Sequence, residues 1–132
     1  MPLDHISIGV ADVKKAKAFY DKALAPLGWK AVMPVEVQGM LVGVGYGDTA
    51  HPTFWIQAPL NRAKATAGNG THIAFTAATR AMVDDFYLAA IDGGGLDDGK
   101  PGLRGEYHPS YYGAFIRDLD GNKIEAVCHT PG

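Results

Sequence analysis

Three side chains of this 132-residue sequence have the chemistry to hold one metal ion: His5, His72 and Glu125. Imidazole nitrogen and carboxylate oxygen both bind first-row divalent metals. A set of two histidines and one carboxylate leaves coordination positions open for water and substrate, as catalytic metal sites require. Each residue alone has a simpler explanation. A strand histidine is commonly a hydrogen-bonded polar residue, and a glutamate near the end of a chain is commonly solvated.

The two histidines occupy the same position of an internal repeat, which favours a joint role. Residues 4–28 and 71–95 align without a gap at an offset of 67 (72 − 5), and seven of the 25 aligned positions are identical. The period is too long for a solenoid and occurs only twice. The repeat predicts two copies of one module joined head to tail, and their pseudo-symmetry would bring His5 and His72 into one cavity.

A strand followed by a helix opens each copy. In residues 3–10 apolar side chains alternate with others, which is typical of a half-buried strand, and His5 points away from the apolar face. Helically spaced apolar residues then follow Asp12, a candidate N-cap. His72 and Thr79 hold the matching places in the second copy.

Short strands are expected after each helix. They fall near residues 29–35, 39–47 and 53–58 in the first half, and near 111–118 and 122–129 in the second. Asp120-Gly121 is a hairpin turn signal between the last two strands. In the last strand Glu125 faces away from the apolar Ile124 and Ala126. The segment LDDGKPGLRGEYHPS, after Gly95, has the composition of a loop.

The order of these elements predicts the α+β class. We expect two tandem β-α-β-β-β modules that form a cup-shaped, mostly antiparallel sheet with the helices on its outer face. The length fits a single domain over residues 1–132, with module one at about 1–60 and module two at about 68–132.

Composition excludes several classes of protein. Fourteen acidic and 12 basic side chains give a net charge of −2, which offers no basic footprint for nucleic acid. No apolar run is long enough to span a membrane, and the first residues lack the features of a signal peptide. The single cysteine excludes an intrachain disulfide framework and fits a reducing compartment, so a cytoplasmic location is expected.

Further candidates for a substrate pocket lie just before the strand at 111–118. Arg104 is suited to clamp a carboxylate or phosphate, and His108 is suited to act as a general acid or base. Tyr112 is placed to donate a hydrogen bond to an oxygen held at the metal. The alternative is a surface loop whose tyrosines pack at a subunit contact.

The openings LDHISIGVAD and GTHIAFTA and the ending RDLDGNKIEAVCH resemble the vicinal oxygen chelate superfamily. It is also called the glyoxalase/bleomycin resistance protein/dioxygenase superfamily, and the resemblance covers essentially the whole chain. It implies paired modules around a divalent metal and a homodimer. By this resemblance His5, His72 and Glu125 match the ligand positions of the family.

One ligand position departs from the glyoxalase I pattern. Enzymes of that type carry a fourth ligand, Glu or His, on the last strand of the first half, and here that strand reads TFWIQAP. Alignment with KIEAV places Trp55 at the position, and a shift of two residues places Gln57 there. Indole binds no metal and an amide is a weak ligand, which argues against a glyoxalase I mechanism. Three ligands resemble the extradiol dioxygenase pattern, although those enzymes usually carry two such double modules.

The expected function is that of a divalent-metal-dependent enzyme acting on a small oxygen-chelating substrate, with lyase or isomerase chemistry favoured. The ligand set suits Fe, Mn, Ni or Zn. Two alternatives remain: an extradiol-type dioxygenase, or a non-catalytic drug-binding protein of the bleomycin-resistance kind. Retention of three metal-type residues argues against the second alternative.

Overall fold

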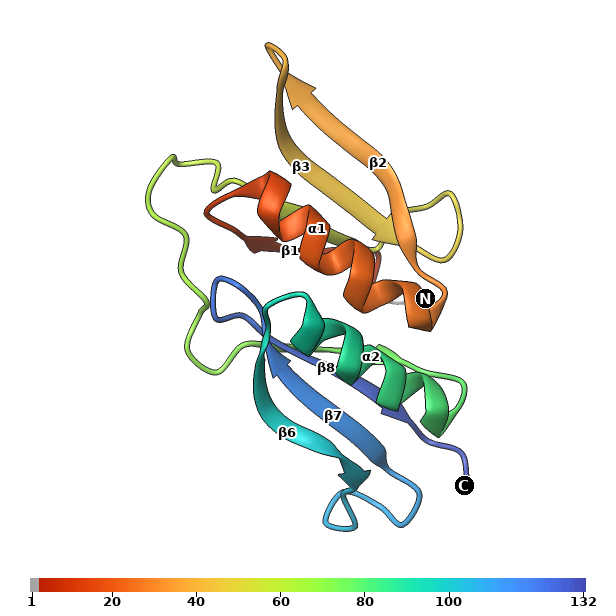
Figure 1. Cartoon of the computed structure of the whole chain (residues 1–132). Coiled ribbons are helices and arrows are strands. Elements are labelled where there is room, and N and C mark those ends of the chain that lie inside the picture. The colour runs from red at the N-terminus through yellow and green to blue at the C-terminus, as the bar shows by residue number, and fades with distance from the viewer. Residues whose placement is uncertain (1–2) are drawn as a thin grey trace.

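The structure, a computed structural model, describes residues 3–132 and consists of two β-α-β-β-β modules (Figure 1). The first contains β1 (Ile6–Gly9), α1 (Val13–Leu24), the short 3₁₀ helix η1 (Ala25–Leu27), β2 (Lys30–Val37), β3 (Met40–Gly47) and β4 (Phe54–Gln57). The second contains β5 (His72–Thr76), α2 (Arg80–Asp92), β6 (Leu96–Leu103), β7 (Tyr112–Arg117) and β8 (Lys123–Cys128). The predicted α+β class and tandem modules are confirmed.

Each module has its own four-stranded sheet. The strand orders are β1-β4-β3-β2 and β5-β8-β7-β6, so the two sheets have the same topology. The first strand of each module pairs in parallel with the last, and the other pairs are antiparallel. Figure 1 shows each helix lying across one face of its own sheet, and α1 packs beside α2. The opposite face of each sheet is not covered by the helix of its own module.

The predicted caps begin both helices. The carboxylate of Asp12 accepts a hydrogen bond from the backbone N of Lys15 at 3.1 Å, and the Thr79 hydroxyl accepts one from Met82 N at 3.2 Å. Each cap satisfies an amide that has no partner within the first turn. Within residues 3–132 no helix is long and apolar enough to cross a membrane.

The prediction of a loop after Gly95 was wrong for residues 96–103, which form the strand β6, and holds for residues 104–110. β6 pairs with β7 at the edge of the second sheet, with register shifts on both sides of Gly99, whose φ is +154°. Asp, Gly, Lys and Pro are unfavourable strand residues, but an edge strand tolerates them because only one side of its backbone is paired. Pairing with β7 therefore overrides the local propensity.

The loop between β7 and β8 joins the two modules. Its Asp118 carboxylate accepts a 2.6 Å hydrogen bond from the buried hydroxyl of Tyr20 on α1. Asp120 accepts a hydrogen bond from the backbone N of Ala11 at 2.8 Å, and the Asn122 amide donates to the Gly9 carbonyl at 3.3 Å. The DLDGN segment is thus a turn and also a polar link between the modules.

Candidate metal centre

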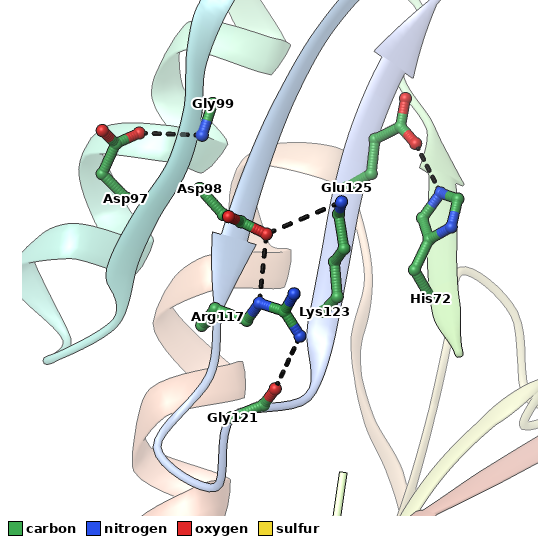
Figure 2. A network of polar contacts seen from close by, with 8 residues as sticks. All are labelled: His72, Asp97, Asp98, Gly99, Arg117, Gly121, Lys123 and Glu125. Carbon is green, nitrogen blue, oxygen red and sulfur yellow. Dashed lines mark hydrogen bonds and ion pairs between the residues drawn. The ribbon is translucent and has the colours of Figure 1, made fainter. Parts of the chain in front are cut away.

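His72 and Glu125 meet on the face of the second sheet that lies away from α2. The Nε2 atom of His72 is 2.9 Å from Oε1 of Glu125 (Figure 2). The parallel ladder pairs Ala74 with Glu125, so His72 is a diagonal neighbour of the glutamate. Glu125 is only 1% exposed, whereas the His72 side chain is 43% exposed. A buried carboxylate thus lies beneath an imidazole that solvent can reach.

Tyr111 holds the second oxygen of the same carboxylate. Its hydroxyl donates a hydrogen bond to Oε2 of Glu125. Burial, together with the nearby carboxylate, raises the pKa of Tyr111 well above its usual range, so the hydroxyl keeps its proton. Gly113 leaves the room for this contact, because a Cβ there would lie 3.1 Å from both Glu125 Oε2 and Tyr111 Cε1.

Tyr112, by contrast, does not face the carboxylate, and the prediction that it lines the pocket requires correction. Its hydroxyl donates to Asp84 of α2 at 2.7 Å, and Arg80 lies over its ring. Neighbouring residues of a strand point to opposite faces of the sheet. Tyr111 therefore faces Glu125, and Tyr112 faces α2. Counting back by twos from Phe115, which pairs with Glu125, would have identified Tyr111.

His5 lies in the first module and does not join the His72–Glu125 pair within one chain. Its Nδ1 atom is 2.6 Å from Asp4, whose other oxygen is 3.4 Å from His51 Nε2. The hydrogen bond with His5 is the main cause that lowers the pKa of Asp4. His5 lines a hollow of about 480 Å³, and His72 lines another. Across residues 3–132 no three His, Cys, Asp or Glu side chains are arranged to hold one metal ion.

The ladders decide between Trp55 and Gln57 as the counterpart of Glu125. Ser7 and Ala74 are equivalent in the repeat (74 − 7 = 67), and they pair with Trp55 and Glu125 respectively. Trp55 is therefore the counterpart of Glu125 in the first sheet. Gly45 makes room for it, since a Cβ there would lie 2.9 Å from the indole. Both Trp55 and Gln57 line the hollow that contains His5.

Arg104 and His108 lie at the Tyr111 end of the second sheet. The Arg104 guanidinium lies 5.5 Å from the centre of the Phe115 ring and donates to the Lys100 carbonyl at 2.6 Å. His108 accepts a hydrogen bond at Nδ1 from the backbone N of Ser110, so its neutral ring carries the proton on Nε2. That atom is 2.8 Å from Nδ1 of His129, a contact that the sequence did not indicate.

The His72–Glu125 pair fits two ligands of one divalent ion. Nitrogen and oxygen ligands bind such ions at about 2.1 Å, and two ligands at a right angle then lie about 3 Å apart. Within residues 3–132, moreover, no lysine or arginine forms an ion pair with Glu125. A buried carboxylate without a fixed cation is the kind of group that coordinates metals.

The chain is thus a small protein of two β-α-β-β-β modules. It has an imidazole–carboxylate pair, the candidate metal centre, on one sheet. The model of the Glyoxalase/Bleomycin resistance protein/Dioxygenase superfamily matches residues 2–126. The chain belongs to this superfamily. No curated protein matches the sequence.

Solved structures agree with this assignment. A glyoxalase/bleomycin resistance protein from Albidiferax ferrireducens T118 is 34% identical with a TM-score of 0.84, over 98% of this chain and 100% of that one. A family enzyme from Burkholderia phytofirmans PsJN is 21% identical with a TM-score of 0.72, over 97% and 98%. A V278E mutant of glyoxalase I from Zea mays is 21% identical with a TM-score of 0.74, over 97% of this chain but 46% of the maize chain. The last two similarities show the fold alone.

Proposed function

We propose that the protein is a divalent-metal-dependent enzyme that acts on a small oxygen-chelating substrate by lyase or isomerase chemistry. The observation that carries this proposal is the buried Glu125 carboxylate, which faces His72 rather than a lysine or arginine. Fe, Mn, Ni and Zn all suit the imidazole and carboxylate donors. The buried free thiol of Cys128 is consistent with a reducing compartment such as the cytoplasm.

The third ligand in this proposal is His5 of the partner subunit in a homodimer. The repeat makes His5 the counterpart of His72, and its side chain is 54% exposed beside an open hollow. The His72–Glu125 pair likewise lies on a sheet face that α2 does not cover. Pairing the first module of one chain with the second module of another would bring these two open faces together.

The chain's own residues have separate tasks in this site. A bound divalent ion would supply Lewis acidity toward a substrate oxygen, worth several kcal/mol of charge stabilisation. Tyr111 holds its proton against Glu125 Oε2 and fixes the orientation of the carboxylate. Trp55 presents an apolar wall where a second carboxylate would be needed to move a substrate proton. Proton transfer by a carboxylate at that position is therefore not part of the proposal.

Elemental analysis of protein purified without chelators tests metal binding. We expect about one divalent ion per chain in the parent and in the matched control His129→Ala, and loss of the ion in His72→Ala and Glu125→Gln. A parent chain without metal would contradict the proposal. So would a His5→Ala, His72→Ala double variant that retains the metal of the parent.

An extradiol-type dioxygenase is the second candidate, and Trp55 is the observation that favours it. With an indole at the fourth position, the proposed site has three protein ligands, as in that class. Oxygen consumption by the Fe(II)-loaded protein with a catechol distinguishes the two reactions. If oxygen uptake depends on both catechol and Fe(II), the protein is a dioxygenase and the proposal of lyase or isomerase chemistry is wrong.

A further inference from the structure

A polar hollow of about 590 Å³ adjoins the candidate metal centre. His72 lines it, together with Arg117, Lys123 and the loop of residues 66–71. No carboxylate side chain is among the described residues that line it. A ligand held in this hollow would therefore lie next to the imidazole and against two cationic groups.

The two cations share a single carboxylate. Oδ2 of Asp98 lies 3.0 Å from Arg117 Nε and 3.6 Å from Lys123 Nζ, so one negative charge faces two positive charges (Figure 2). Because the contact between Lys123 and Asp98 is the longer of the two, the Lys123 ammonium can still donate to another acceptor. An ammonium carries three N–H donors, and only this one acceptor lies within ion-pair distance of it among residues 3–132.

The surroundings hold Lys123 in a defined place. Its ammonium lies 5.0 Å from the centre of the Phe115 ring, a cation–π distance. Lys123 also pairs with His72 in the parallel ladder of β8 and β5. The positive charge is thus tied to the strand position next to the candidate metal ligand, unlike the charge of a freely moving surface lysine.

The loop of residues 66–71 supplies uncharged donors to the hollow. Residues 66–71 include Thr66, Asn69 and Thr71, and a turn closed by Thr71 N and the Gly68 carbonyl, 3.2 Å apart, sets the path of the loop. Hydroxyl and amide groups can complete the solvation of an anion that two cations attract.

We infer that the substrate of this site carries an anionic group, a carboxylate or a phosphate, which Lys123 and Arg117 bind beside His72. The inference deepens the proposed function, because it assumes that the substrate approaches a metal at His72 and Glu125. Arg104, whose guanidinium also lies near the Phe115 ring, is not among the residues that line this hollow.

Calorimetric titration of the metal-free full-length protein at low ionic strength tests the subsite, with inorganic phosphate and malonate as separate probes. We expect saturable binding of at least one anion, weakened about tenfold or more in Lys123→Gln, because a charge-assisted hydrogen bond is lost. Asp98→Asn should bind the same anion more tightly, since it removes the competing carboxylate. Lys14→Gln, the same charge change on the exposed face of α1, should bind as the parent does.

The relative affinity of the two probes identifies the group: tighter malonate binding assigns a carboxylate, and tighter phosphate binding assigns a phosphate. No saturable binding of either anion, or equal affinities in the parent and in both Lys123→Gln and Asp98→Asn, would overturn the inference. If Lys123→Gln does not fold, Asp98→Asn alone decides. Because the titration is done without metal, its failure is distinct from a failure to find metal in the purified protein.

Discussion

At the scale of single residues, the proposed metal centre contains a buried carboxylate whose two oxygens both have polar partners. Glu125 meets His72 through one oxygen and the Tyr111 hydroxyl through the other. Alternation along the last strand was enough to predict which face Glu125 occupies. It was not enough to select Tyr111 over Tyr112, because the start of β7 has no clear sequence boundary and one residue decides the face.

The Tyr111 contact predicts a role in metal affinity. In Tyr111→Phe the carboxylate loses the donor that orients it, and we expect metal affinity to fall by about tenfold or more, as for other groups that orient ligands. Competition with a chromogenic chelator measures the change. Tyr107→Phe, an exposed tyrosine whose ring contacts Tyr111, is the control and should retain the parent affinity. Equal affinities in Tyr111→Phe and the parent would show that Glu125 needs no such support.

At the scale of elements, local patterns predicted most of the fold. Alternating apolar residues marked β1, β5 and β8, and the caps at Asp12 and Thr79 marked where the helices begin. β6 was missed because its composition is that of a loop, and its backbone becomes a strand only through its pairing with β7. The place of His5 relative to His72 depends on how modules pair, which no local pattern encodes.

We expect the Thr79 cap of α2 to contribute measurably to the free energy of unfolding. Replacing Thr79 by alanine leaves the Met82 amide without its acceptor, and we expect the free energy of unfolding to fall by about 1 kcal/mol. Chemical denaturation with urea measures the loss. Thr79→Ser keeps the hydroxyl and should stay close to the parent. A similar loss in the serine variant would attribute the effect to the threonine methyl group.

At the scale of the whole molecule, the 118–122 loop links modules that each have a separate sheet. Tyr20 and Asp118 form the buried part of the link, at 0% and 4% exposure.

Tyr20→Phe removes a hydrogen bond to a buried carboxylate, and we expect it to lower the free energy of unfolding by about 1.5–3 kcal/mol. Denaturation that remains two-state, with a reduced midpoint, would support this, and an unchanged midpoint would contradict it.

The same contact predicts loss of stability at alkaline pH. Burial, reinforced by the Asp118 carboxylate, raises the pKa of Tyr20 well above its ordinary value of 10.0. The unfolded chain therefore releases this proton first, so the contribution is complete below about pH 10 and is lost as the pH rises further. One such tyrosine contributes at most about 1.4 kcal/mol per pH unit. Unfolding between about pH 9 and 11 should be less pH-dependent in Tyr20→Phe than in the parent, and an identical dependence would contradict this assignment.

We propose a metal site shared between two chains, with His5 from one and His72 and Glu125 from the other. Its most direct test is the metal content of a mixed dimer made by co-expressing differently tagged His5→Ala and Glu125→Gln chains. In a shared arrangement one of the two sites in the mixed dimer keeps all three ligands. We predict one divalent ion per mixed dimer and none in either variant alone. A mixed dimer without metal, or a parent chain that binds metal as a monomer, would contradict the claim.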